Sequence, residues 1–269
     1  MDLHSFYDHL DEFAYKHWFE GIETPWQPLD QLKQSVGDAM ANLPDLRKVT
    51  FLDGLSLAQN GSLSRLNEPA CLVERWVEIE EPVLLEPLGI VLDKGTVLEP
   101  SAIIKGPALI GKGCEIRQGA YLRGNVVVGD HCVIGHNTEI KNSILMNHSE
   151  AGHFNYIGDS IIGSYVNLGA GSRLANLEFR SPADKRDMLF PRILLDVDGN
   201  EIHTGRSKFG AVLGDYAEIG CNAVLSPAVL MGKESWVYPN VTVPKGYYPP
   251  QTRLVPPDRK VKPKRQSSK

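Results

Sequence analysis

Aliphatic residues recur in this sequence at a fixed interval of six. The run is Leu92, Leu98, Ile104, Ile110, Ile116, Leu122, Val128, Ile134, Ile140 and Met146, and several members are followed by glycine. Such an interval fits neither the 3.6-residue turn of an α-helix nor the two-residue alternation of a lone strand. It suits short strands joined by turns, three strands to a coil, each directing one aliphatic side chain inward. The sequence therefore predicts a mainly β protein, a parallel β-helix in which residues about eighteen apart stack.

The interval is interrupted twice within the repeat region. It slips near residues 150–161 and is absent from residues 177–207. Inside the second interruption, the stretch RILLDVDGNEIHTG predicts a β-hairpin that turns at Asp198 and Gly199. We therefore expect a β-helix domain over residues 86–245, with residues 177–207 inserted as a protruding loop.

The segments on either side of the repeats have different patterns. Residues 1–47 predict a short α-helical region, because apolar side chains follow helical spacing over residues 3–18 and again from Leu29 to Leu43. Short β-type runs over residues 48–85 predict strands that lead into the β-helix. Residues 246–269 are rich in proline and turn basic, which predicts a mobile tail.

The charge balance and the cysteines exclude several classes of protein. Lys and Arg number 28 against 33 Asp and Glu, so the chain has no overall basic field of the kind that nucleic-acid binding requires. No stretch approaches the roughly 18 apolar residues that a membrane span needs. The four cysteines form no CxxC pair, which argues against a disulfide framework. We expect a soluble, cytoplasmic protein without nucleic-acid partners or a membrane span.

Polar motifs within the repeats indicate which hexapeptide protein this is. The stretches EIKNS, EAGHFNYIGD, YVNLGAG and SKFGAVLGD resemble the acetyltransferase domain of the bifunctional glucosamine-1-phosphate acetyltransferase and N-acetylglucosamine-1-phosphate uridyltransferase. The chain is even more similar to the C-terminal β-helix of archaeal-type sugar-1-phosphate nucleotidylyltransferases, over about residues 86–245.

The resemblance implies a left-handed parallel β-helix and an activity. The expected reaction is N-acetylation of a hexosamine 1-phosphate by acetyl-CoA, without a metal, in the synthesis of nucleotide sugars such as UDP-N-acetylglucosamine for the cell envelope. It also implies a homotrimer. The N-terminal part lacks the LxxGxGxRxxP signature of a nucleotidylyltransferase, so we expect that activity to be absent here and to come, if needed, from a separate partner.

Carried over by position, the resemblance assigns roles to side chains on the acceptor side. His153 is the expected general base, and a histidine is chemically suited to take a proton from an amine near neutral pH. Arg123 and Lys141 match positions that hold the sugar phosphate. The other matched acceptor positions are Tyr156, Asn167, Asn176 and Lys208.

The same resemblance places the acyl donor. Gly169 and Ala170 match small residues that let the acetyl-CoA thioester approach and offer a backbone N–H to the carbonyl oxygen. Cys221 matches a small polar residue beside the pantetheine arm. The sequence departs from the family at Leu177, where a tyrosine is expected, and at Pro239, where a small residue is expected near the coenzyme A tail.

Two other functions remain open from the residues alone. His131 and His136, like His148 and His153, are separated by four residues, and stacked histidines also bind zinc in carbonic anhydrases of this fold. A silent scaffold that only binds sugar phosphate, or assembles with a nucleotidylyltransferase, is the other alternative. Arg123 and Lys141 should be neighbours one coil apart, where Glu139 could neutralise them without any phosphate.

Overall fold

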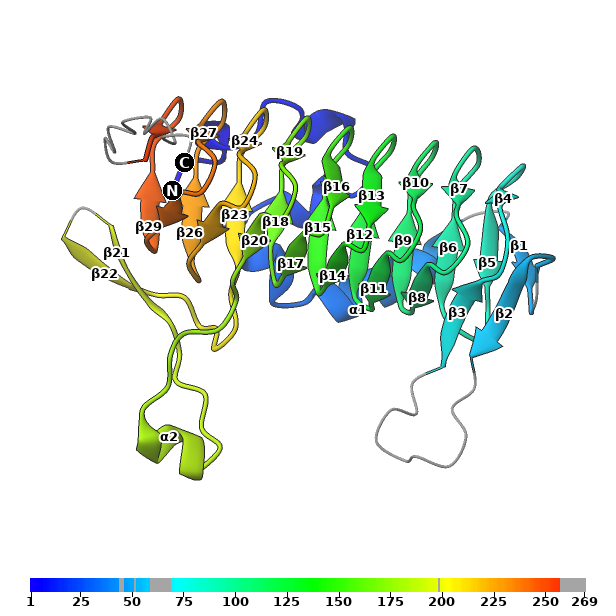
Figure 1. The fold of residues 1–269 in the computed structure, drawn as a ribbon, viewed down its shortest axis with the longest axis horizontal. Helices are drawn as coiled ribbons and strands as arrows, with labels where there is room; N and C mark the ends of the chain where they lie inside the picture. The colour runs from blue at the N-terminus through cyan, green and yellow to red at the C-terminus, as the bar shows by residue number, and fades with distance from the viewer. Residues whose placement is uncertain (44–45, 51, 59–68, 198, 257–269) are drawn as a thin grey trace, which may run out of the picture.

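Most of the chain forms a β-solenoid with a triangular cross-section. The computed structural model describes residues 1–43, 46–50, 52–58, 69–197 and 199–256. From Ile90 onward, the strands of the solenoid visit three long sheets in turn, which we call A, C and B, and then return to sheet A one coil further along (Figure 1). The predicted β-helix is confirmed, and its left-handed sense stays a prediction.

Each sheet stacks one short strand from every coil. Sheet A contains β1 (Arg47–Val49), β5 (Val83–Leu85), β6 (Ile90–Leu92), β9 (Ala108–Ile110), β12 (Val126–Val128), β15 (Ser143–Leu145), β18 (Ile161–Ile162), β23 (Ala211–Leu213), β26 (Val229–Met231) and β29 (Gly246–Tyr248). Sheet C contains β4 (Val77–Glu78), β7 (Val97–Leu98), β10 (Glu115–Ile116), β13 (Val133–His136), β16 (Glu150–His153), β19 (Asn167–Leu168), β24 (Glu218–Ile219), β27 (Trp236–Val237) and β30 (Arg253–Leu254). Sheet B contains β2 (Leu55–Ala58), β3 (Ala70–Val73), β8 (Ile103–Lys105), β11 (Tyr121–Arg123), β14 (Glu139–Lys141), β17 (Tyr156–Gly158), β20 (Arg173–Leu174), β25 (Val224–Leu225) and β28 (Thr242–Val243).

The pairing register explains where the six-residue interval slips. Ile110 pairs with Val128, eighteen residues on, but Val128 pairs with Leu145, only seventeen residues on. One residue is therefore missing from that coil before Met146. Leu145 points into the solenoid in place of Met146, which packs on the outer side of sheet A. The assignment of Met146 to the inward series was wrong.

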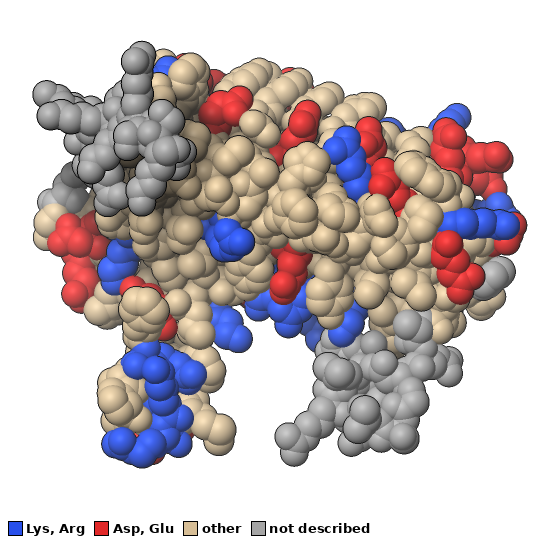
Figure 2. Space-filling model, viewed as in Figure 1, with Lys and Arg blue, Asp and Glu red and all other residues tan. Residues whose placement is uncertain are grey.

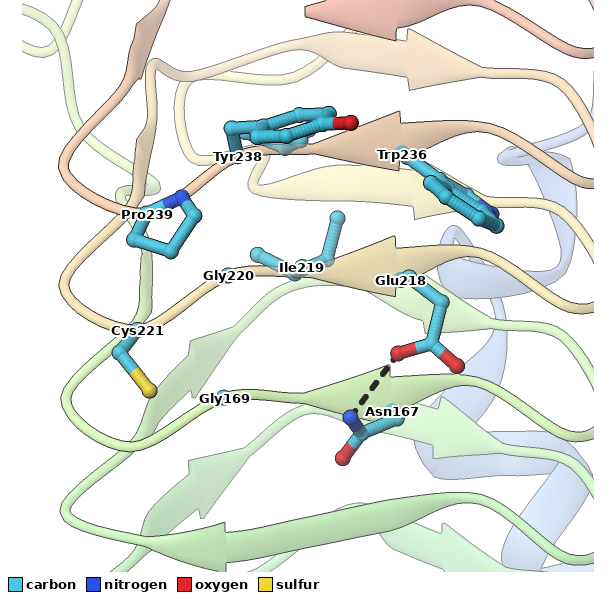
Figure 3. A pocket seen from close by; sticks show the side chains of 10 residues that line it. Asn167, Gly169, Glu218, Ile219, Gly220, Cys221, Trp236, Tyr238 and Pro239 are labelled. Atoms are coloured by element: carbon cyan, nitrogen blue, oxygen red, sulfur yellow. Dashed lines mark hydrogen bonds between the residues drawn. The ribbon is translucent and has the colours of Figure 1, made fainter. Parts of the chain in front are cut away.

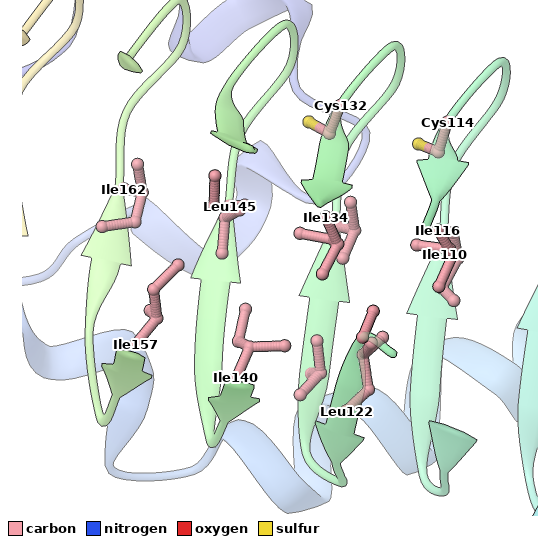
Figure 4. Packing of buried hydrophobic residues seen from close by; sticks show 14 of the residues in the cluster. Ile110, Cys114, Ile116, Leu122, Cys132, Ile134, Ile140, Leu145, Ile157 and Ile162 are labelled. Carbon is pink, nitrogen blue, oxygen red and sulfur yellow. The ribbon is translucent and has the colours of Figure 1, made fainter. Parts of the chain in front are cut away.

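A continuous column of aliphatic side chains fills the solenoid. Ile116, Leu122, Ile134 and Ile140 are among the inward residues with no exposed surface, and Figure 4 shows them stacked coil upon coil. Each inward side chain packs against its equivalents in the neighbouring coils, so burial accumulates along the solenoid. The rigidity of this core fixes the positions of outward side chains.

The N-terminal segment covers the outer face of sheet A. It contains the 3-10 helices η1 (Leu3–Ser5), η2 (Leu10–Glu12), η3 (Lys16–Phe19) and η4 (Gln27–Leu29), followed by α1 (Leu32–Asn42). Phe6, Phe13 and Trp26 are buried against outward residues of sheet A such as Val127 and Leu230.

The helix expected over residues 3–18 was wrong, whereas the second predicted helix is present as α1. Tertiary contacts explain this difference. Phe6 O accepts a hydrogen bond from Asp215 N, and the backbone N–H groups of Asp8 and His9 donate to the Asp215 carboxylate. These contacts take backbone groups that a continuous helix would use internally.

The insertion between β20 and β23 has two parts. The predicted hairpin is present as β21 (Leu194–Val197) and β22 (Asn200–His203), with Asp198 outside the described residues. Ile193 and Leu195 are buried with Trp26 and Phe209, so this hairpin is anchored to the body. The sequence did not predict α2 (Pro182–Arg186), which protrudes from the solenoid and lies below it in Figure 1.

The two ends of the solenoid extend beyond residues 86–245. At the first end, the lead-in strands are integrated into the sheets, and β3 and β4 pair antiparallel with β8 and β7. At the other end, β29 and β30 pair parallel with β26 and β27. The prediction of a mobile tail from residue 246 was therefore wrong as far as Leu254, while residues 257–269 lie outside the described residues. None of the helices in the described part of the chain is long and apolar enough to cross a membrane.

Candidate functional site

A groove of about 500 Å³ lies on the outer face of sheet C toward the last coils. Its walls are Asn167, Gly169, Glu218, Ile219, Gly220, Cys221, Trp236, Val237, Tyr238 and Pro239. Figure 3 shows Asn167, Glu218 and Trp236 in one column, with Gly169, Cys221 and Pro239 along the other side. The predicted donor residues Gly169 and Cys221 thus line the groove, and the acceptor residue Asn167 lies there with them.

Polar and aromatic groups define the two ends of this column. Asn167 Nδ2 donates to Glu218 Oε2 at 2.9 Å, which fixes the amide at the groove wall. The Arg253 guanidinium carbon lies 3.4 Å from the centre of the Trp236 ring. This cation–π contact holds the half-exposed indole flat beside the groove.

Close stacking of the coils requires glycine at position 169. A Cβ atom on Gly169 would lie 2.6 Å from Cys221 N and 2.7 Å from Ile219 O, both backbone atoms. Such distances are too short for real Cβ contacts, so a larger residue would push the coils apart. The glycine that the resemblance assigned to the donor therefore has a structural role of its own.

His153 lies at the corner where sheet C meets sheet B, one coil before the groove. Ala151 pairs with Leu168, so His153 comes opposite Ala170, and Gly171 N donates to His153 O at 2.9 Å. The buried Asn155 holds this corner. Its Oδ1 accepts from His153 N at 3.0 Å, and its Nδ2 donates to Gly169 O at 2.8 Å. A rigid turn thereby places the backbone of His153 next to Ala170 and Gly171 at the edge of the groove. The His153 imidazole is exposed and is not among the side chains that line the groove.

The predicted phosphate residues lie on the outer face of sheet B and already have acidic partners. Leu122 pairs with Ile140, so the residues that follow, Arg123 and Lys141, are neighbours as expected. Arg123 Nη1 lies 2.6 Å from Glu139 Oε1, and Lys141 Nζ lies 3.3 Å from Asp159 Oδ2. Bound phosphate is therefore not needed to explain why two cations lie side by side here.

Tyr156 and Asn176 belong to this same cluster on sheet B. Tyr156 Oη donates to Asn176 Oδ1 at 3.2 Å, and Asn176 Nδ2 donates to Asp159 Oδ2 at 2.5 Å. Burial, and secondarily the Glu139 carboxylate, raise the pKa of the Tyr156 phenol. The phenol therefore keeps its proton near neutral pH and can act as a hydrogen-bond donor.

Lys208 lies where the insertion returns to the solenoid. Its Nζ is 5.5 Å from the centre of the Phe190 ring, which also lies 4.2 Å from the Arg180 guanidinium carbon. Figure 2 shows the basic side chains of the insertion gathered around α2 below the body. Lys208 is therefore held by the insertion, whereas Arg123 and Lys141 are held by the coils.

The structure divides the histidines of the zinc alternative between two corners. His131 and His148 stack with ring centres 5.2 Å apart at the corner from sheet A to sheet C. His136 pairs with His153 at the other end of the sheet C strands. Among the residues that the structure describes, no three His, Cys, Asp or Glu side chains gather closely enough to hold a metal ion.

Several side chains of the site were not predicted from the sequence, among them Glu218, Trp236 and Asp159. Glu218 and Trp236 immediately precede the inward residues Ile219 and Val237, which is the outward position of the repeat. Their outward repeat position could have indicated from the sequence that these two side chains lie on the surface near the groove. Asp159 had no such signal, because its partners Asn176 and Arg206 come from the two ends of the insertion.

The curated relatives of this chain are longer proteins. The matched segment is 36% identical over 110 residues to the bifunctional sugar-1-phosphate nucleotidylyltransferase/acetyltransferase of Sulfurisphaera tokodaii, covering 41% of this chain and 25% of that protein. It is 37% identical over 112 residues to the bifunctional protein GlmU of Methanococcus vannielii, covering 42% of this chain and 25% of that protein. The chain thus matches about a quarter of the length of these relatives.

The solved structures similar to this chain are more distant. One is a point mutant of AntD, an N-acyltransferase from Bacillus cereus in complex with dTDP and coenzyme A, at 16% identity and a TM-score of 0.24. That match covers 66% of this chain and 82% of that chain. We therefore transfer neither the ligands nor the reaction of that protein to this chain.

A family model identifies the repeat region directly. The model of the GMPPB C-terminal domain matches residues 104–243, which is 140 of the 269 residues and includes all the predicted site residues. The match also covers the groove on sheet C and the polar cluster on sheet B. The chain therefore belongs to the family of the GMPPB C-terminal domain.

Proposed function

We propose that this protein is an acyltransferase that moves an acetyl group from acetyl-CoA to the amine of a hexosamine 1-phosphate. The observation that carries the proposal is the placement of His153 on a rigid corner beside a mainly apolar groove. The name of the Sulfurisphaera relative, which includes an acetyltransferase, supports the same reaction class.

The groove fits an extended thioester arm. Its walls are mostly apolar, and glycines at 169 and 220 keep the backbone close to its floor. Asn167 and Glu218 supply the polar groups of one wall, and Trp236 supplies a flat apolar wall at the far end. Such a lining favours a flexible, largely apolar chain over a compact charged ligand.

In the proposed reaction, His153 acts as the general base. The imidazole takes a proton from the acceptor amine as the nitrogen attacks the thioester carbonyl carbon, and the carbon–sulfur bond breaks as thiolate leaves. A backbone N–H near Ala170 stabilises the developing oxyanion. Tyr156, Asn167 and Asn176 orient the sugar.

To bind the cations on sheet B, the acceptor phosphate must compete with their acidic partners. Arg123 and Lys141 would bind it only if the phosphate displaces or shares their contacts with Glu139 and Asp159, and Lys208 would approach from the insertion. Because the polar cluster and the groove lie on different faces of one chain, we propose a homotrimer in which sheet B of one copy meets sheet C of another. A separate nucleotidylyltransferase would then use the acetylated product.

One observation favours a second candidate, a non-catalytic sugar-phosphate-binding or assembly module. Two of the three candidate phosphate cations, Arg123 and Lys141, already form ion pairs with Glu139 and Asp159, which is what a purely structural surface would show. The two candidates differ in one measurable respect, since only the acyltransferase releases thiol from acetyl-CoA.

The experiment is a thiol-release assay of the full chain with acetyl-CoA and a panel of amino-sugar phosphates, with and without a chelator. The acyltransferase proposal expects acceptor-dependent thiol release that the chelator leaves unchanged. Binding of both ligands without thiol release would instead establish the non-catalytic module.

A further inference from the structure

Asp159 is a buried carboxylate at the corner where sheet B turns into sheet A. Only 7% of its side chain is exposed, and its backbone adopts the left-handed region at φ 51°. Each carboxylate oxygen has two partners. Oδ1 accepts from Asn142 Nδ2 at 2.8 Å and lies 3.9 Å from Arg206 Nη2. Oδ2 accepts from Asn176 Nδ2 at 2.5 Å and lies 3.3 Å from Lys141 Nζ.

These partners include both ends of the insertion. Asn176 is the last residue before residues 177–207, and Arg206 lies at their end. The backbone closes the same junction, because Phe209 N donates to Asn176 O and Gly210 N donates to Asp159 O, both at 2.9 Å. Arg206 also lies 2.6 Å from Asp30 Oδ1 in the N-terminal segment. One side chain therefore ties the solenoid to both ends of the insertion.

The same carboxylate also orients the acceptor side of the proposed site. It contacts Lys141 directly, and it fixes the Asn176 amide whose oxygen accepts from Tyr156 Oη. We propose that Asp159 is a positioning residue that holds the insertion and the acceptor-binding side chains Lys141 and Tyr156 in one geometry. The acceptor part of this inference rests on the proposed function, whereas the anchoring of the insertion does not.

The proposal and simple electrostatics predict opposite changes in phosphate affinity when Asp159 is replaced. Removing a carboxylate beside Lys141 and Arg206 would by itself raise the local positive potential and tighten the binding of a phosphate. If Asp159 positions these groups, its loss instead weakens phosphate binding, because Lys141 and Asn176 lose their fixed orientation. The sign of the change in affinity therefore separates the two roles.

The test compares four variants of the full chain with the wild type. Asp159→Asn removes the charge and retains the shape, and Asn176→Ala removes the hydrogen bond but retains the carboxylate. The double variant Asp159→Asn with Asn176→Asp restores the hydrogen bond with donor and acceptor exchanged. Asp187→Asn, an exposed carboxylate on the insertion, is the matched control.

Two readouts are needed. Hydrogen exchange across residues 177–207 reports the anchoring of the insertion, and titration with glucosamine 1-phosphate, together with KM and kcat, reports the acceptor side. We expect about tenfold faster exchange in Asp159→Asn and Asn176→Ala, and about tenfold weaker sugar-phosphate binding in Asp159→Asn. We expect kcat to change by less than about threefold, and we expect the double variant to recover.

Each alternative result has a distinct meaning. Exchange rates in the insertion equal to wild type in both single variants would overturn the anchoring, even if the protein transfers no acetyl group. Tighter or unchanged sugar-phosphate binding in Asp159→Asn would overturn the positioning of the acceptor side. Absence of thiol release by wild-type protein would overturn the proposed function, while the exchange data would still decide the role of Asp159. If Asp159→Asn does not fold, Asn176→Ala and the double variant decide.

Discussion

Sheet A and sheet C are built from the same repeat but present opposite outer surfaces. Val127, at an outward position of sheet A, is fully buried beneath the N-terminal segment. Val133, at an outward position of sheet C in the next strand of that coil, is only half-buried. The sheet A strands β6, β9, β12, β23 and β26 are accordingly apolar and buried on both faces, whereas most strands of sheets B and C bury only one face.

The covered face of sheet A therefore contributes to stability, whereas the candidate site lies on the uncovered faces. The N-terminal segment buries Phe6, Phe13 and Trp26 on sheet A and so makes that face part of the core. The groove and the polar cluster lie on the two faces that it leaves open. A substitution on the covered face should therefore affect folding, and one on an open face should affect ligand binding or turnover.

The largest expected effect comes from placing a charge on each kind of face. Val127→Asp should abolish cooperative folding or lower the free energy of unfolding by about 4 kcal/mol or more, because an unpaired carboxylate is buried. Val133→Asp, the same change on the open face, should cost about 1 kcal/mol or less. Chemical denaturation measures both, and equal losses would show that the two faces do not differ.

Replacing the proposed base should affect turnover without affecting stability. His153→Asn should lower kcat by about 10² to 10⁴, the usual effect of losing a general base, since the exposed imidazole contributes little to folding. His136→Asn, at the paired position one coil earlier, is the control and should retain most activity. Equal losses in the two variants would assign the effect to the column of histidines and not to a base.

A smaller effect is expected at the wall of the groove. Trp236→Ala should raise the KM for acetyl-CoA about tenfold and leave kcat largely unchanged, because the indole would contact the donor in ground and transition states alike. Trp76→Ala is the matched control, since this indole is 65% exposed at the other end of the solenoid. Loss of donor affinity in the control variant would place the donor elsewhere.

The smallest effect concerns alkaline pH and the covered face. Burial, together with Asp93 and Asp130, raises the pKa of Tyr15 in the N-terminal segment to about 12. The folded state thus holds this proton more tightly than the unfolded state, whose phenol titrates near 10. The contribution of Tyr15 to stability is complete below about pH 10 and is lost as the pH rises toward 12.

Denaturation series from pH 9 to 12 measure this effect. Wild-type stability should fall more steeply than that of Tyr15→Phe, which has no phenol to ionise. Parallel pH profiles for the two proteins would mean that Tyr15 is not protected by its burial.

The repeat made the fold predictable, whereas contacts across long sequence distances limited the rest. Each coil repeats the same local pattern, so the inward column from Leu92 to Ile140 could be read directly from its period. The N-terminal 3-10 segments were mispredicted, because their backbone groups bond to Asp215, more than two hundred residues away.

In the candidate site as well, residues at repeat positions were predictable and those that depend on distant contacts were not. His153 and Asn167 lie within the repeats and could be proposed from the resemblance. Trp236 precedes the inward residue Val237, and this outward repeat position could have indicated that it lines the groove. Asp159 could not be predicted from the sequence, because its role depends on Asn176 and Arg206, which come together only in the folded chain.

Hydrogen exchange of the full chain with and without acetyl-CoA tests the central claim most directly, that the open faces bind ligand and the covered face does not. The account predicts slower exchange in β19, β24 and β27 on addition of acetyl-CoA, with no change in η1 to η4 or α1. Protection confined to the N-terminal segment, or no protection anywhere at saturating acetyl-CoA, would contradict it.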